Sequence, residues 1–220
     1  MSKIQTRFYD LVNVPLVQNT SISLVGCGAV GSFAAIALAK MGFRKWELWD
    51  MDIVEEVNVG VQLYDLSHVG KLKTHALSEI IEKNGEGMEI ITVEKFEEDD
   101  RLEADIVICA VDTMAARALV LAGTPEGAWF IDTRMDAFDG RCFAFVNTLT
   151  NRTKYLTTIV PDNEIPNSKC TEKSTVFCAY MAAFHVIKSI FDRIRNTAGN
   201  YNVTVWAQGS TLTLGSRPEL

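Results

Sequence analysis

The sequence predicts an α/β protein with a doubly wound, mostly parallel sheet and antiparallel strands at its C-terminal end. Short apolar runs alternate with segments of helical periodicity from residue 21 to residue 148. A glycine-rich turn, residues 26–31, joins the first of these runs to the first long helix. The tail, residues 201–214, alternates apolar and polar residues and predicts antiparallel edge strands that turn near residues 208–209.

The length of 220 residues suits a single domain, residues 1–220, in which residues 1–20 form an N-terminal arm. Within this arm we expect a short amphipathic helix and a loop around Pro15. The next elements form a β-α-β unit, because an apolar run, the glycine turn, an Ala-rich stretch and a second apolar run follow each other without a breaker. They are a strand at 21–25, a helix at 33–41 that Gly42 ends, and a strand at 45–49.

The same alternation continues along the chain. It predicts helices at 71–83 and 113–122, and strands at 88–93, 104–111, 129–132 and 142–148. The run at 104–111 is almost wholly apolar, as expected of a parallel strand buried on both faces. Residues 150–174 are rich in Thr, Asn and Pro and predict a long mobile surface loop. A helix follows, whose predicted apolar face carries Val176, Phe177, Tyr180, Met181, Phe184, Ile187, Phe191 and Ile194.

Charge, hydropathy and cysteine spacing exclude several classes of partner and site. The net charge of −7, without a block of Lys and Arg, disfavours nucleic acid as a partner. No stretch reaches the roughly 20 apolar residues of a membrane span, so we expect no membrane partner and a cytoplasmic location. Five irregularly spaced cysteines without a C-x-x-C pair predict reduced, mostly buried thiols rather than a disulfide framework or a zinc site.

The glycine turn predicts a phosphate-binding site. Gly26, Gly28 and Gly31 have the G-x-G-x-x-G spacing between a strand and a helix, where free backbone N–H groups and the positive helix end hold an anion. Asp50 ends the second strand, 22 residues beyond Gly28, and a carboxylate there accepts hydrogen bonds from ribose hydroxyls. These residues alone leave open a dinucleotide or ATP, or a glycine triplet that serves packing only.

The segment after the second strand resembles the adenylation loop of the ThiF/MoeB and ubiquitin-activating enzyme superfamily, whose pattern is D-x-D-x-V-x-x-x-N-L-x-R-Q. The matching residues are Asp50, Asp52, Val54, Asn58 and Gln62. Further matches follow in the family's order: Arg7-Phe8-Tyr9, Gly70-Lys71-Leu72-Lys73, Asp112 with Arg117, Cys170, and a helix through Ile187-Lys188. The resemblance covers roughly residues 5–190 and implies a Rossmann-like ThiF fold.

The resemblance implies an ATP-dependent adenylyltransferase that activates the C-terminal Gly-Gly carboxylate of a ubiquitin-like or sulfur-carrier protein. Lys73 would face the phosphates, and Asp112 would bind Mg²⁺ at the end of a buried strand. Asn58 and Gln62, four residues apart, would point their amides toward the nucleotide. A solvated lysine, a helix N-cap at Asp112 and ordinary turn polarity are the respective alternatives.

The resemblance also implies a homodimer in which Arg7 reaches the neighbouring subunit's site, and a role for Cys170 in accepting the carrier. Lys169 and Lys173 flank Cys170 and favour its thiolate. A surface arginine and an unreactive exposed thiol are the alternatives. Arg117 would orient Asp112, cap a carboxylate or form a plain salt bridge.

Two departures from the family pattern stand out. Ala29 replaces a glycine, a small change, while Val61 replaces the arginine before Gln62 and supplies no donor to a phosphate. The residues therefore leave two further functions open: a catalytically impaired binding module and an NAD-dependent oxidoreductase. A charged cluster has no role in the family resemblance, and we expect a solvated loop there; it comprises Asp132, Arg134, Asp136 and Asp139.

Overall fold

The computed structural model describes the backbone of residues 11–135, 139–164, 175–207 and 210–215. Within these ranges, eight strands form one sheet in the order β3-β2-β1-β4-β5-β6-β7-β8. The strands are β1 (Ser21–Val25), β2 (Lys45–Trp49), β3 (Glu89–Val93), β4 (Ile106–Cys109), β5 (Trp129–Met135), β6 (Gly140–Val146), β7 (Tyr201–Ala207) and β8 (Ser210–Gly215).

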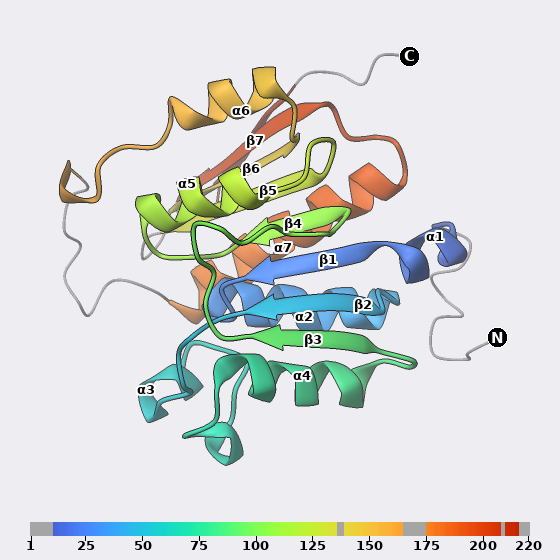
Figure 1. The fold of residues 1–220 in the computed structure, drawn as a ribbon, viewed down its shortest axis with the longest axis vertical. Helices are drawn as coiled ribbons and strands as arrows, with labels where there is room; N and C mark the ends of the chain where they lie inside the picture. Colours follow the sequence, from blue (N-terminus) through green and yellow to red (C-terminus); the bar gives the residue numbers. More distant parts are fainter. Residues whose placement is uncertain (1–10, 136–138, 165–174, 208–209, 216–220) are drawn as a thin grey trace.

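The sheet changes direction at β5. Strands β3, β2, β1, β4 and β5 pair in parallel, whereas β6, β7 and β8 are added as antiparallel neighbours. The parallel part places the carboxyl ends of β1, β2, β4 and β5 at one edge of the sheet (Figure 1). Ligands bind beyond the carboxyl ends of parallel strands in such sheets. The predicted doubly wound sheet with antiparallel C-terminal strands is confirmed.

Helices cover both faces of the sheet (Figure 1). They are α1 (Val14–Asn19), α2 (Ala29–Met41), α3 (Glu56–Val59), α4 (Lys73–Asn84), α5 (Met114–Gly123), α6 (Leu149–Leu156) and α7 (Val176–Ile194), with short 3₁₀ turns η1 (Leu66–His68) and η2 (Asp162–Glu164). Residues of α2, α4 and α7 belong to one apolar cluster, and residues of α5 and α6 belong to another. The two clusters are the cores on the two faces of the sheet. None of the described helices has the length and apolar character needed to cross a membrane.

Several predicted boundaries are wrong. Helix α2 begins at Ala29 rather than residue 33, because Gly28 already serves as its N-cap. Pro15 lies in the first turn of α1, where its missing N–H costs no hydrogen bond, and not in a loop. Part of the predicted loop at 150–174 is helix α6, since the Thr148 hydroxyl caps it and Tyr155 packs into the core. Residues 1–10 and 165–174 lie outside the described residues.

Helix α7 forms as predicted, but only part of its predicted face packs against the core, through Met181, Ile187 and Ile194. Its buried residues are mainly small: Cys178, Ala179, Ala182, Ala183, His185, Val186 and Ile190. Small side chains let the equally Ala-rich helix α2 approach closely. Phe177, Tyr180 and Phe184 are exposed, although the Tyr180 ring stacks on Phe33 of α2 at 4.2 Å between centroids. The aromatic half of the predicted face thus remains on the surface of the described chain.

Candidate functional site

The glycine turn between β1 and α2 depends on close backbone approach. Gly26 adopts φ +97°, and a Cβ there would lie 2.5 Å from the Ala110 carbonyl oxygen. A Cβ on Gly31 would lie 2.0 Å from the Gly26 carbonyl oxygen, so helix and turn could not keep this distance with a side chain. Gly28 has no atom within 4 Å of its would-be Cβ, which leaves open space at the start of α2. The turn therefore fits an approaching phosphate.

Asp50, at the end of β2, ties this turn to the following loop. Its Oδ2 accepts a hydrogen bond from the backbone N–H of Cys27 at 2.7 Å, and its Oδ1 accepts one from Asp52 N–H at 2.9 Å. Burial raises the pKa of Asp50, and these two backbone donors oppose the rise. Both oxygens retain lone pairs that can accept hydroxyl donors, as the predicted ribose contact requires.

Lys73, the first residue of α4, lies against the same loop. Its ammonium pairs with Asp52 at 2.7 Å between Nζ and Oδ2, and its side chain is only 9% exposed, compared with 57% for Asp52. The Tyr64 hydroxyl donates to the Cys27 carbonyl at 2.6 Å, which links the glycine turn to the chain just before α4. The alternative of a solvated lysine is wrong. Lys71, in contrast, pairs with Glu79 at the surface.

The two amides of the adenylation-loop pattern have different surroundings. The Asn58 Oδ1 accepts from the backbone N–H of Glu55 at 2.9 Å, so Asn58 closes the first turn of α3. The buried Oε1 of Gln62 has no hydrogen-bond donor among the described residues. Gln62 still follows Asn58 by one helical turn, since its N–H donates to the Asn58 carbonyl at 2.8 Å. Of the two amides, the Gln62 one is therefore better able to accept from a ligand, and Val61 beside it supplies no side-chain donor.

Asp112 follows β4 at the same edge of the sheet and is exposed. Its predicted alternative role as a helix cap is wrong, because Thr113 is the N-cap of α5 and accepts from Ala116 N–H. The N–H groups of Met114 and Ala115 donate instead to the Asp162 carboxylate, at 2.7 and 3.3 Å. Among the described residues, none donates a hydrogen bond to the Asp112 carboxylate. It is available for a cation, and Mg²⁺ is commonly held by one or two carboxylates together with substrate phosphates.

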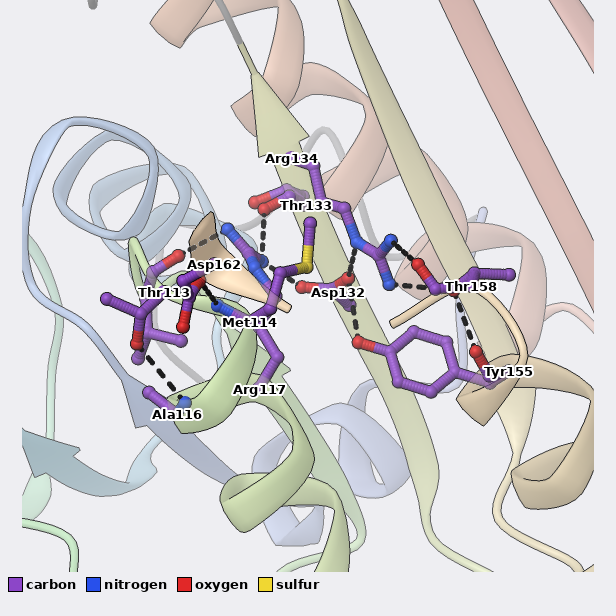
Figure 2. A network of polar contacts seen from close by, with 11 residues as sticks. Thr113, Met114, Ala116, Arg117, Asp132, Thr133, Arg134, Tyr155, Thr158 and Asp162 are labelled. Carbon is purple, nitrogen blue, oxygen red and sulfur yellow. Dashed lines mark hydrogen bonds and ion pairs between the residues drawn. The ribbon is translucent and has the colours of Figure 1, made fainter. Parts of the chain in front are cut away.

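A charge network around the buried Asp132 lies toward the end of β5, where the charge pattern of the sequence had predicted only solvated residues (Figure 2). Asp132 on β5 is fully buried and pairs with Arg117 and with Arg134, the latter at 2.8 Å between Nε and Oδ2. The Tyr155 hydroxyl donates to the same carboxylate at 2.9 Å. The expectation of a solvated loop is wrong for Asp132 and Arg134, because β5 continues through both.

A signal for this network was present in the sequence. Asp132 ends an apolar run, as Asp50 ends another, and the carboxyl ends of parallel strands share one edge. The register pairs Asp132 with Cys109, three residues before Asp112. The ion pair could not be predicted from the sequence, because Arg117 and Asp132 lie 15 residues apart on different elements. Asp136 lies outside the described residues, and Asp139 is exposed.

Two predicted site residues, Arg7 and Cys170, lie outside the described residues. The others lie on the segments that follow β1, β2 and β4: the glycine turn with Ala29, Asp50, Asp52, Asn58, Gln62, Lys73 and Asp112. No group of three or more His, Cys, Asp or Glu side chains in the described part of the chain could hold a metal by itself. The four described thiols are buried, as predicted; they belong to Cys27, Cys109, Cys142 and Cys178.

Comparison with curated proteins gives relatives that include dehydratases and activating enzymes. The chain is 35% identical over 105 residues to the tRNA threonylcarbamoyladenosine dehydratase of Bacillus subtilis, covering 44% of this chain and 41% of that protein. It is 30% identical over 110 residues to the NEDD8-activating enzyme E1 catalytic subunit of Caenorhabditis elegans, covering 48% and 26%. The matches thus span less than half the length of these relatives.

Solved structures share the fold at low sequence identity. PaaA superposes with a TM-score of 0.73 at 16% identity, over 97% of this chain and 68% of PaaA. Escherichia coli MccB with ATP gives a TM-score of 0.73 at 14% identity, over 99% and 72%. The ThiF family model matches residues 4–214, which is nearly the whole chain. The protein therefore belongs to the ThiF family.

Proposed function

We propose that the protein is an ATP-dependent adenylyltransferase that activates a C-terminal carboxylate of a protein or peptide. One observation carries this proposal: the glycine turn, Asp50, the buried Lys73 and the exposed Asp112 lie along the carboxyl ends of neighbouring strands. A dinucleotide site would account for the turn and Asp50. It would leave unexplained a buried lysine on one side and, on the other, a carboxylate that accepts from no described residue.

The residues divide the work by charge and position. The N–H groups at the start of α2 would bind phosphate, and Asp50 would accept from the ribose. Lys73 would neutralise phosphate charge, with Asp52 keeping its ammonium in place by the 2.7 Å contact. The Gln62 amide oxygen, which accepts from no described residue, would bind the nucleotide. Mg²⁺, when bound at Asp112, would neutralise further charge as pyrophosphate leaves. Positioning and charge neutralisation account for most of catalysis in such a reaction.

The proposed substrate is a ubiquitin-like or sulfur-carrier protein that ends in Gly-Gly. The similarity to the NEDD8-activating subunit and the structures of MccB with MccA support a protein or peptide substrate. The dehydratase relatives, whose name includes tRNA, make a tRNA-linked substrate the second candidate. The net charge of −7 favours the carrier protein, because tRNA binding depends on neutralising phosphates.

The proposed assembly is a cytoplasmic homodimer in which Arg7 completes the neighbouring site and Cys170 accepts the carrier. The exposed aromatic side chains of α7, Phe177, Tyr180 and Phe184, are consistent with a protein interface. Light scattering at tens of micromolar tests the dimer. A monomeric mass would remove the role of Arg7 across subunits.

Alkylation with limiting iodoacetamide should label Cys170 before the buried cysteines.

Calorimetric titration with ATP and Mg²⁺, and separately with NAD⁺, tests the proposed function. Lys73→Met should weaken ATP binding by about tenfold or more, since it removes a charge-assisted contact. Lys71→Met is the matched control, because Lys71 is also ion-paired near the start of α4 but faces Glu79 at the surface. Tight binding of NAD⁺ without ATP binding would overturn the proposal. ATP binding without ATP–pyrophosphate exchange on any Gly-Gly carrier would indicate the impaired binding module that Val61 suggests.

A further inference from the structure

Few hydrogen bonds hold the turn between β4 and α5, which carries Asp112. Strand β4 ends at Cys109, and α5 begins at Met114. The N–H of Ala110 still donates to the Val25 carbonyl at 2.8 Å, and the N–H of Met114 donates to Asp162. Between these two fixed amides lie Val111, Asp112 and Thr113. Thr113 is fixed as the N-cap of α5, so the direction of the Asp112 side chain depends on what holds Val111 on its other side.

Arg117 supplies that hold from the next helical turn. One terminal nitrogen of its buried guanidinium donates to the Val111 carbonyl. The other donates to the Thr133 carbonyl at 2.7 Å and pairs with the Asp132 carboxylate. A planar guanidinium can serve several acceptors in fixed directions, which a lysine ammonium on its flexible stem cannot do. Arg117 thereby joins the turn after β4 to the end of β5 (Figure 2).

Asp132 in turn keeps Arg117 in place. The carboxylate is fully buried and is held from its other side by Arg134 and by the Tyr155 hydroxyl. Arg134 resembles Arg117 in charge and partner, but its remaining donors go to Thr158, at 2.8 Å to the carbonyl and 2.9 Å to the hydroxyl. The two arginines share one carboxylate and serve different loops. Of the two, Arg117 is the one that contacts the turn with Asp112.

We infer that Arg117, oriented by Asp132, is a positioning residue that fixes the Val111–Asp112 backbone and so directs the Asp112 carboxylate toward the cation and phosphates. This inference rests on the proposed function for the role of Asp112. The residue acts through the Val111 carbonyl rather than by touching substrate. The link that Arg117 makes between the turn after β4 and the end of β5 would thus determine where the Asp112 carboxylate points.

Two matched variants test the inference, Arg117→Lys and Arg134→Lys. Both keep a positive charge beside Asp132, but only Arg117→Lys removes the bridge to Val111. Hydrogen exchange without nucleotide should be about tenfold faster at Ala110 and Met114 in Arg117→Lys, since the lost contact is a hydrogen bond to a charged group. Arg134→Lys should leave both amides as in wild type. Equal exchange in the two variants would overturn the inference, whether or not the protein binds ATP.

The Mg²⁺ concentration that ATP binding requires distinguishes an Arg117 that positions Asp112 from one that only stabilises the fold. The Mg²⁺ concentration for half-maximal ATP binding should rise about tenfold in Arg117→Lys and stay unchanged in Arg134→Lys. Faster exchange with an unchanged magnesium requirement would overturn the positioning role. If Arg117→Lys does not fold, Asp132→Asn should show the same faster exchange at Ala110. Wild-type protein that binds no ATP would overturn the proposed function, while the exchange result would still decide the role of Arg117 in holding the turn.

Discussion

The two halves of the candidate site are built by different means. Around β1 and β2, the backbone makes the site: glycines permit close approach, and Asp50 accepts from two nearby N–H groups. Around β4 and β5, buried charges make it: Asp132 binds Arg117 of α5, Arg134 of its own strand and the Tyr155 hydroxyl of α6. The first half depends on close approach of the backbone and on hydrogen bonds from backbone N–H groups, and the second on ion pairs and a hydrogen bond between side chains.

The difference affects how each half should respond to substitution. Removing one charge of a buried pair leaves its partner uncompensated in a low-dielectric interior. Substitutions in the half around β4 and β5 should therefore lower the free energy of unfolding strongly. In the half around β1 and β2, Asp50 is half-buried and Asp52 is exposed, so water can partly replace the contacts that a substitution removes. Substitutions of the acidic side chains there should reduce nucleotide binding more than stability.

The largest effect should come from Asp132→Ala. It leaves Arg117 and Arg134 buried without their shared carboxylate, and removing one partner of a buried pair costs about 3–5 kcal/mol. Urea unfolding at pH 7 measures the loss. Glu79→Ala is the control, since the Lys71–Glu79 pair has 40% exposure on each side chain and is screened by water, so its loss should be much smaller. Similar losses in the two variants would remove the distinction between the two halves.

Asp50→Ala should act mainly on ligand binding. It removes a charge-assisted hydrogen bond to the ribose, worth about 1.5–3 kcal/mol, so ATP affinity should fall about tenfold or more. Calorimetry measures the affinity, and urea unfolding in parallel should show a smaller loss than in Asp132→Ala. Unchanged affinity would place the ribose elsewhere.

Gly31→Ala and Gly28→Ala separate packing from ligand approach within the glycine turn. A Cβ on Gly31 would lie 2.0 Å from the Gly26 carbonyl oxygen, so Gly31→Ala should cost about 1–3 kcal/mol of stability. A Cβ on Gly28 meets no atom within 4 Å, so Gly28→Ala should leave stability within about 1 kcal/mol and weaken ATP binding. Thermal unfolding and calorimetry together check both. Full ATP affinity in Gly28→Ala would show that phosphate does not approach there.

The smallest effect concerns the pH dependence of Asp50. Burial raises the pKa of Asp50 above its value of about 3.9 in an unfolded chain. Between these two pKa values the folded state binds more protons than the unfolded state, so this group makes the free energy of unfolding fall as pH rises through that window. The difference in unfolding free energy between wild type and Asp50→Asn should show this slope above pH 4 and become flat above the folded pKa. A flat difference throughout would mean that Asp50 is not buried as described.

Local sequence patterns were enough to predict the alternation of strands and helices, the parallel sheet with antiparallel strands at its end, and the glycine turn with Asp50. Apolar periodicity, glycine spacing and strand ends are all visible within a few residues of one another. The burial of Lys73 and the ion pair of Arg117 with Asp132 needed the folded chain, since both depend on which elements become neighbours. The buried face of α7 needed it too. Periodicity marks apolar residues, but the close packing of α2 selects the small ones and leaves Phe177 and Phe184 outside.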